Sequence, residues 1–456
     1  MGYKKFWNEE IETLPKEKLK KLQLKRLKRV VELAYNKSPF YRKLYDEAKV
    51  KPSDIKHLED IKKLPLIDKK KVVSAYPFDL IITDKKNLVE LHSGTLPNKN
   101  ILPVFATRED LSMWAELNAR SLWMVGLRPK DKILNAFRFG LSTGGFGFHY
   151  GASKIGAISI PASVGRTLFQ IQLILDLKVD AVCMMPSYAV HLGLTAKEIG
   201  IDLKEESNLR IGLFGAEPFS YNTRRKIEEL LGLTAYDEYG MNEFLGPGMA
   251  CECEERKGLH IWADAFLVEC INPRTNEWVE EGEEGELVWT WLTSTGTAMI
   301  RYRSHDISFI TWEKCSCGRT HPKMSAKISR SDNALCIGGY VVYPEKIYDL
   351  LREIPDIGFF QIIIETKKAL DVLTLKIEVV DAQILKNQYF SQKLISKIKS
   401  IISNYIGVKP EIILCEPFSI SGKFAEKKIP YIVLDYRIDS GKYGIKAEEE
   451  FERREK

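Results

Sequence analysis

Long apolar runs are missing from this sequence. No stretch reaches the roughly 18 uninterrupted apolar residues that a membrane-spanning helix needs, and the start, MGYKKFWNEE, lacks the apolar core of a secretory signal. A charge excess of one sign is also missing, because 68 Lys+Arg against 62 Asp+Glu leave a net charge of only +6 over 456 residues. We therefore expect a cytoplasmic protein with no membrane partner and no nucleic-acid partner.

Cysteine is sparse, and linkers and repeats are absent. The chain has eight cysteines, which in a large unsecreted protein indicate free thiols or metal ligands rather than a disulfide framework. There is no internal repeat and no Pro-rich or Gly/Ser-rich linker. What is present is 45% hydrophobic and 29% charged residues, so the chain can bury a large core as an enzyme-sized globule of two or more domains.

Three patterns follow one another along the first 330 residues. Residues 9–47 are rich in Lys, Glu and Leu at helical spacing, which predicts a basic amphipathic helix with a solvated face. From about 88 to 240, short apolar runs alternate with helix-like stretches, which favours βαβ units on a mainly parallel sheet. Residues 257–312 are apolar runs separated by turns, which favours antiparallel or barrel-like structure.

The tail beyond about residue 330 follows a different order. It predicts strands at YVVY, GFFQIIIE, LTLKIEVV and EIILC and helices at 344–352 and 391–405. This βαββαβ order is that of a small ferredoxin-like domain. We therefore expect an α/β domain over 1–330 and a small α+β domain over 331–456, with the boundary near Arg330–Asn333.

Six segments carry candidate chemistry. They are HSGTLPNK (92–99), GAEP (215–218), DEYGMNE (237–243), RYRSHD (301–306), SRSDN (329–333) and SGKFAEKK (421–428). Ser93, Gly94 and Thr95 can offer N–H groups and hydroxyls to phosphate oxygens, with Lys99 as the counter-charge, although such turns are common. A carboxylate such as Glu243 suits Mg²⁺ beside phosphates. Asp306 can accept both hydroxyls of a ribose, and Lys423, after a glycine, can reach an anionic transition state.

The cysteines fall into two groups. Four of them, Cys183, Cys270, Cys336 and Cys415, lie in apolar runs, where packing is the expected role. The others are near a histidine: Cys253 and His260 flank the turn EERKGL, and Cys315 and Cys317 form a tight knuckle. Three thiolates and one imidazole suit a tetrahedral structural zinc. Cys251 is the alternative to Cys253, and a packed turn with reduced thiols is the alternative to zinc.

Together these segments resemble the AMP-forming phenylacetate–CoA ligases of the adenylate-forming acyl-CoA synthetase superfamily. The resemblance runs almost end to end and is carried by HYGA, GAEP, YG-x-x-E-x-x-GPG and CGRTHP in one order. It implies that a carboxylate attacks the α-phosphorus of ATP, giving an acyl-adenylate and pyrophosphate, and that the thiol of coenzyme A then displaces AMP. It also implies magnesium, supports the zinc interpretation, makes a homodimer possible, and implies that the small domain is mobile and rotates between the two half-reactions.

The resemblance also assigns roles to single residues. The adenine and adenylate contacts correspond to Ala216, Glu217, Asp237, Tyr239 and Gly240, and Asn242 stands beside the α-phosphate. Glu243 corresponds to the magnesium carboxylate, Asp306 to the ribose acceptor and Arg330 to a nucleotide partner, while Asp332 is the hinge and Lys423 the adenylation lysine. The wall of the acid pocket corresponds to Phe137, Phe139, Gly144, Gly145 and His149, an aromatic set that suits an aryl or arylalkyl acid. Some of these aromatic residues are expected to be ordinary core.

Two departures from the family pattern leave other functions open. The usual phosphate loop is Ser-Ser-Gly-Thr-Thr-Gly-Lys-Pro, whereas this chain lacks its second glycine and has Pro97, which has no N–H to donate. His305 stands where Thr or Arg is commoner. The alternatives to CoA ligation are therefore nucleotidyl transfer to a deazaflavin coenzyme, as in related enzymes, and a degenerate zinc-stabilised paralogue that acts as a binding protein.

Overall fold

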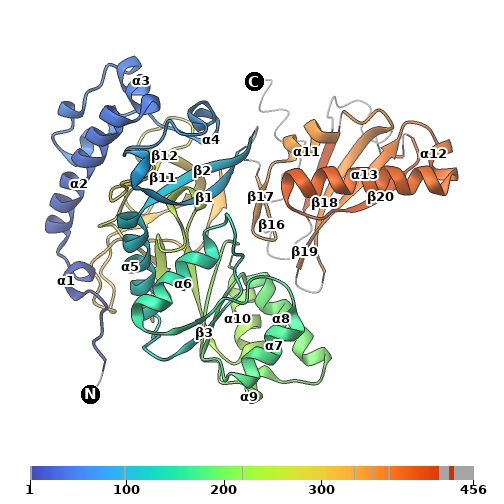
Figure 1. The fold of residues 1–456 in the computed structure, drawn as a ribbon, viewed down its shortest axis with the longest axis horizontal. Coiled ribbons are helices and arrows are strands. Elements are labelled where there is room, and N and C mark those ends of the chain that lie inside the picture. Colours follow the sequence, from blue (N-terminus) through green and yellow to red (C-terminus); the bar gives the residue numbers. More distant parts are fainter. Residues whose placement is uncertain are drawn as a thin grey trace. The chain divides into compact units, whose positions relative to one another are not determined.

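The computed structural model describes residues 3–96, 99–217, 219–332, 334–351, 353–367, 370–417, 419–420 and 431–435. The chain separates into two compact units, Met1–Ser331 and Asp332–Lys456 (Figure 1). The larger unit is α/β and the smaller one is α+β, so the predicted fold class is confirmed. No helix among the described residues is both long enough and apolar enough to cross a membrane.

The amphipathic N-terminal region forms three helices: α1 (Glu9–Glu12), α2 (Lys16–Lys37) and α3 (Pro39–Glu47). Prolines mark the starts of the second and third helices, because proline fits the beginning of a helix but cannot continue one. The side chain of Ser38 caps α3 by accepting from the N–H of Tyr41. The buried face of α2 consists of Leu19, Gln23, Leu27, Val30, Val31 and Ala34. The predicted amphipathic pattern is present, but it is divided among three helices instead of one.

A nine-stranded sheet forms the centre of the large unit, in the order β13-β14-β9-β8-β7-β6-β5-β3-β4. Its parallel part consists of β3 (Lys132–Asn135), β4 (Ile158–Ile160), β5 (Ala181–Met184), β6 (Ile211–Gly215) and β7 (Thr234–Tyr239). The intervening helices are α6 (Gly144–Ile155), α7 (Thr167–Asp176), α8 (Pro186–Glu198), α9 (Leu203–Glu206) and α10 (Tyr221–Leu231). Every residue of β5 and β6 is buried, as expected for parallel strands covered on both faces. The predicted βαβ organisation is therefore correct.

Antiparallel strands complete the large unit. The strands β8 (Ala250–Glu252), β9 (Leu259–Ile261), β14 (Lys323–Met324) and β13 (Ile310–Thr311) extend the central sheet beyond β7. A second sheet contains β10 (Phe266–Ile271), β11 (Gly285–Trp291), β12 (Tyr302–Ser308) and β15 (Ser329–Arg330), all antiparallel. A separate hairpin of β1 (Leu88–Leu96) and β2 (Lys99–Thr107) leads into α5 (Arg108–Met124), which Thr107 and Asp110 cap. The short helix α4 (Lys69–Val72) precedes this hairpin.

The small unit has a four-stranded sheet in the order β20-β19-β18-β21. Its elements are the strands β18 (Ile357–Lys367), β19 (Leu370–Val379), β20 (Glu411–Cys415) and β21 (Tyr431–Asp435) and the helices α11 (Pro344–Leu351), α12 (Gln383–Lys386) and α13 (Gln388–Ile406). The predicted strand at YVVY exists as β17 (Tyr340–Val342), but it pairs with β16 (Leu335–Ile337) in a separate hairpin. Instead β21, which the sequence did not predict, pairs in parallel with β18. The α+β class is therefore correct and the pairing of its first strand is not.

Candidate functional site

Three residues that are far apart in the sequence meet around one carboxylate. Asp306 on β12 accepts a hydrogen bond from the Tyr239 hydroxyl at 2.6 Å and one from the guanidinium of Arg330 at 2.8 Å. The two donors occupy different oxygens of the carboxylate. The Tyr239 ring also stacks on Trp289, with ring centroids 5.5 Å apart. The structure thus brings together three residues that the sequence predicted to contact the nucleotide.

The other predicted adenylate residues lie at the ends of two neighbouring parallel strands. Ala216 and Glu217 follow β6. Asp237 lies inside β7, Tyr239 ends that strand and Gly240 follows it. The two strands pair directly, with Gly215 opposite Glu238. In open α/β sheets, ligands bind at the carboxyl ends of such strands. A Cβ atom on Gly240 would approach Gly246 Cα to 2.8 Å, so this turn needs glycine.

Asp237 is buried more deeply than a solvent-facing adenine contact would be. Its N–H donates to Glu252 Oε2 at 2.9 Å, and the same oxygen is 2.8 Å from the guanidinium of Arg224. Burial raises the pKa of Asp237 well above its usual range, and the nearby Glu252 carboxylate raises it further, although Arg224 opposes the shift. The side chain of Asp237 therefore belongs to a buried acid network.

Glu243 lies in a short 3-10 turn, Asn242–Phe244, directly after the strand that carries Tyr239. Its Oε1 atom is 3.3 Å from Lys69 Nζ and accepts from the Tyr302 hydroxyl at 3.3 Å. The neighbouring Asn242 side chain accepts from the Thr143 hydroxyl at 2.5 Å. Lys69 is a functional candidate that the sequence did not reveal, because it belongs to a plain run of three lysines at the start of α4. Only the fold brings it to Glu243.

The segment 92–99, expected to be a phosphate loop, is largely β-hairpin. Ser93, Gly94 and Thr95 lie in β1 and Lys99 begins β2; Ser93 is opposite Pro103 and Gly94 opposite Leu102. The N–H of Ser93 donates to the Leu141 carbonyl at 2.9 Å. A glycine-poor segment flanked by LVEL and ILPVF has the composition of paired strands rather than of a flexible cradle. The described residues of this segment are therefore strand rather than loop, and their contact with phosphate stays a prediction; Pro97 and Asn98 lie outside the described residues.

His92 is a buried polar residue of this hairpin. Its Nε2 atom is 2.6 Å from Glu90 Oε1, and the Tyr150 hydroxyl donates to both oxygens of the same carboxylate at 3.0 and 3.1 Å. Burial, together with the hydrogen bond to Glu90, raises the pKa of Tyr150 to about 12. The His92 ring lies edge-on to Trp114 and Phe146. His92, which stands where the family loop usually has serine, is therefore packed in a cluster with Glu90, Tyr150 and two aromatic rings.

The predicted wall of the acid pocket contains two groups of aromatic rings in contact. Phe137 stacks on Phe148 with centroids 5.2 Å apart, and Phe139 lies edge-on to Phe146 at 5.1 Å and to His149 at 6.3 Å. Phe137 and Phe148 are buried and belong to the core, whereas Phe139 and His149 are only half-buried.

The two glycines of this wall fit closely beneath its rings. A Cβ atom on Gly145 would come within 2.8 Å of the Phe139 ring, and one on Gly144 within 3.3 Å of Phe137. Larger residues would displace the rings.

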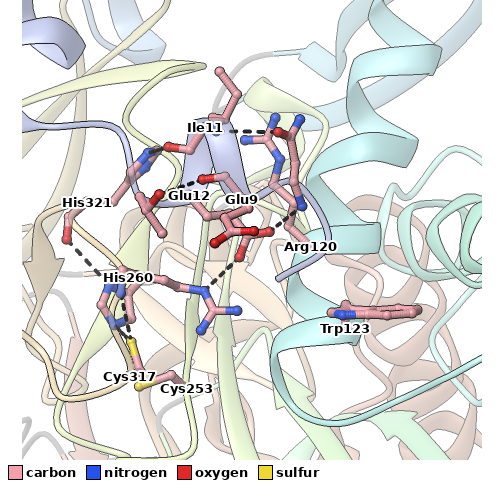
Figure 2. A network of polar contacts seen from close by, with 12 residues as sticks. Glu9, Ile11, Glu12, Arg120, Trp123, Cys253, His260, Cys317 and His321 are labelled. Carbon is pink, nitrogen blue, oxygen red and sulfur yellow. Dashed lines mark hydrogen bonds and ion pairs between the residues drawn. The ribbon is translucent and has the colours of Figure 1, made fainter. Parts of the chain in front are cut away.

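Four metal-ligating side chains converge at the predicted zinc site. The ligand atoms of Cys253, His260, Cys315 and Cys317 all lie within 4.8 Å of one another, and Figure 2 shows three of the four. The sulfurs of Cys253 and Cys315 are 3.7 Å apart, close to the roughly 3.8 Å between two thiolates on one tetrahedral zinc. Cys251 does not belong to this group; its thiol donates to the Glu252 carbonyl at 3.4 Å. The donor set therefore fits zinc.

The four side chains of the cluster share protons with one another. The hydrogen bond with Cys253 lowers the pKa of Cys317 to about 2, against the effect of burial. Burial alone would lower the pKa of His260, but the sulfurs of Cys315 and Cys317 outweigh it and raise this pKa. His260 donates through Nδ1 to the His321 carbonyl at 3.4 Å, which leaves Nε2 to face Cys317 at 3.3 Å. Such an outer partner orients a histidine ligand.

The cysteine knuckle also holds the N-terminal segment of the chain. Arg319 Nε donates to Glu12 Oε2 at 2.8 Å, with both side chains almost fully buried. The ring of His321 lies 2.9 Å from the Ile11 carbonyl (Figure 2). The N–H of Thr320 donates to the Glu12 carbonyl. We call the contacts between residues 11–12 and 319–321 the N-terminal anchor. Residues 319–321 come only two residues after Cys317. We therefore expect that a loss of structure in the cysteine cluster also loosens the N-terminal anchor.

Comparison with known proteins agrees with this geometry. Residues 339–437 match the family model of the AMP-binding enzyme C-terminal domain. The phenylacetate–coenzyme A ligase of Thermus thermophilus is 40% identical over 372 residues, which are 81% of this chain and 83% of that protein. The enzyme of the same name from Aromatoleum evansii is 36% identical over 416 residues, 90% of this chain and 93% of that one.

A solved structure agrees over nearly the whole chain. The crystal structure of a 2-hydroxyisobutyryl-CoA ligase in complex with its acyl-adenylate and CoA has a TM-score of 0.89 and 27% identity, and the match covers 95% of this chain and 93% of that chain. The sequence relatives and the fold lead to one conclusion: the chain belongs to the phenylacetate–coenzyme A ligase family and is an AMP-forming CoA ligase.

Proposed function

We propose that this ligase joins an aryl or arylalkyl carboxylic acid, similar to phenylacetate, to coenzyme A through an acyl-adenylate. The observation that supports this acid class is the aromatic cluster of Phe137, Phe139, Phe146 and Phe148 around the Gly144-Gly145 turn. Flat aromatic faces pack favourably on an aryl ring. The names of the sequence relatives agree with this class, whereas the solved relative carries a small aliphatic hydroxy acid.

Each of the two half-reactions has groups among the described residues that can bind its reactants. In the first, a carboxylate oxygen attacks the α-phosphorus and pyrophosphate leaves; no general base is needed, because the acid is already ionised. Asp306 would bind the ribose hydroxyls, with Tyr239 and Arg330 fixing its orientation. In the second, the CoA thiol attacks the acyl carbonyl and AMP leaves. Ala216, Glu217 and Gly240 would border the adenylate at the strand ends.

Two metals belong to this proposal. Glu243 would hold magnesium, which when bound neutralises phosphate charge, and Lys69 supplies positive charge beside the same carboxylate. Cys253, His260, Cys315 and Cys317 would hold a structural zinc, because all four positions of a tetrahedral site are taken by protein ligands. The hinge at Asp332, the adenylation lysine Lys423, a homodimer and a cytoplasmic location stay predictions from the sequence, and Lys423 lies outside the described residues.

The substrate class can be tested by pyrophosphate release with Mg-ATP and a panel of acids. We expect release with phenylacetate or a related aryl acid to exceed that with 2-hydroxyisobutyrate, followed by CoA-dependent thioester formation. Release that prefers the aliphatic acid would contradict the aryl pocket. Release with a deazaflavin coenzyme alone would favour nucleotidyl transfer, and no release with any compound would favour a binding protein.

Substitutions of Glu243 and of Asp306 should affect different steps: the rate of pyrophosphate release in the first case and ATP binding in the second. Glu243→Gln keeps the shape but removes the charge, so we expect mainly a slower release of pyrophosphate. Asp306→Ala removes a charge-assisted pair of acceptors and should weaken ATP binding about 10- to 100-fold. Initial rates over a range of ATP concentrations separate the two effects. The exposed Glu313→Gln is the control, and wild-type release by Glu243→Gln would contradict its role.

A further inference from the structure

Ser331 is the last residue of the large unit, and three contacts hold it there. Its N–H donates to the His305 carbonyl at 2.8 Å. Its hydroxyl donates to Glu286 Oε2 at 3.1 Å and lies 3.2 Å from Nδ1 of the His305 ring. The next residue, Asp332, begins the small unit. The main chain is therefore fixed to the large unit up to the residue before the boundary.

The carboxylate of Glu286 is held in place by Arg303 and in turn contacts Ser331 and His305. It lies on β11, is fully buried, and receives two bonds from Arg303, at 2.8 Å from Nε and 2.6 Å from a terminal nitrogen. A guanidinium that grips a carboxylate at two points fixes its orientation. The other partners of Glu286 are the Ser331 hydroxyl and the His305 ring, whose Nδ1 is 3.4 Å from Oε1.

His305 contacts Ser331 through both its backbone and its ring. Its φ angle is +63°, a region that residues other than glycine adopt rarely and mainly where the surroundings enforce it. The sequence marked this histidine only as a departure from the family pattern. We call Glu286, His305 and Ser331 the hinge latch.

The hinge latch is next in the chain to the residues that contact the Asp306 carboxylate. Strand β15 pairs Arg330 with Asp306 and Ser329 with Ile307, and Ser331 follows at once. We propose that the hinge latch positions the pivot of the small unit at the Ser331–Asp332 bond and keeps Arg330 on Asp306 while the chain beyond it moves. This inference rests on the proposed role of Asp332 as the hinge. Ser331 and His305 are positioning residues, because they act through Arg330 and the pivot.

The first test measures the latch itself, without activity. Hydrogen exchange of the full chain is compared for wild type, Ser331→Ala, Ser331→Thr and Ser329→Ala. Ser331→Ala should speed exchange of the amides at 330 and 331 about tenfold, because β15 loses its side-chain anchor. Ser331→Thr keeps a hydroxyl and should restore slow exchange. Ser329→Ala changes the same strand outside the latch and should leave exchange as in wild type.

The second test measures the two half-reactions separately, as pyrophosphate release and as thioester formation from a pre-made acyl-adenylate. Ser331→Ala should change the ratio of the two rates by about threefold or more and raise the KM for ATP, and Ser331→Thr should reverse both changes. A general loss of folding would instead lower both rates together with the melting temperature.

Each result decides one part of the inference. Unchanged exchange in Ser331→Ala would overturn the latch. Faster exchange with an unchanged ratio of rates, or equal loss of both rates, would overturn its role in positioning the pivot. If the wild-type chain performs neither half-reaction, the proposed function fails, whereas the exchange result still decides whether the latch exists.

Discussion

Replacing Lys423 with alanine should lower acid-dependent pyrophosphate release by roughly 10²- to 10³-fold. Charge builds up on the carboxylate and the α-phosphate as the new bond forms, and one ammonium delivered to that point stabilises it. Lys423 directly follows Gly422, whose backbone can turn freely. Pro97 in the expected phosphate segment has no N–H to donate, so more of the phosphate charge is expected to fall to Lys99 and Lys423.

Two neighbouring lysines provide matched controls for Lys423. Lys427→Ala and Lys428→Ala change the same charge in the same segment, but these residues lead into β21 and should adenylate normally. Thioester formation from a pre-made acyl-adenylate should be largely spared in Lys423→Ala. Normal adenylation by Lys423→Ala with a defect in Lys427→Ala or Lys428→Ala would mean that a different lysine acts. Normal adenylation by all three variants would put the adenylate mechanism itself in question.

Removing one ligand of the cysteine cluster should release its metal. Purified protein is expected to contain about one zinc per chain, and Cys317→Ser should lose it. The loss of a ligand should cost more affinity than the 10- to 100-fold of a lost outer partner. Because metal binding free energy is also folding free energy, the melting temperature should fall. Acid should release the zinc from wild type as well, since the thiolates and His260 must be unprotonated to bind it.

Cys251 provides a matched control for this experiment. It is a buried cysteine two residues from Cys253, but it lies outside the cluster, so Cys251→Ser should keep its zinc. The N-terminal anchor offers a second readout: residues before α2 should become sensitive to protease in Cys317→Ser and stay protected in Cys251→Ser. Stoichiometric zinc in Cys317→Ser, or none in wild type, would contradict the site.

The sequence predicted those features that local pattern determines. The parallel strands were visible as apolar runs between helices, and the cysteine pairs as short spacings around turns, so both could be placed in advance. Residues whose neighbours are distant in the chain could not. Lys69 meets Glu243 across more than 170 positions, and nothing in its own segment marks it.

Strand pairing was the other limit of prediction. YVVY has the composition of a strand, but composition does not say whether its partner is the main sheet or the adjacent β16. The secondary structure of the segment 92–99 was misjudged for a related reason: a familiar motif suggested a loop, while Ser93 and Gly94 pair as strand residues with Pro103 and Leu102.

The N-terminal anchor has a consequence for how the chain is made. Ile11 and Glu12 find their partners only when residues 319–321 exist, about 310 positions later. At ribosomal speeds of about 5–20 residues per second, residues 11–12 of the nascent chain wait roughly 15–60 s for residues 319–321 to be made. During this time the apolar face of α2 has only part of its final surroundings. A ribosome that stalls before the cysteine knuckle therefore leaves residues 11–12 and the apolar face of α2 exposed to chaperones and proteases.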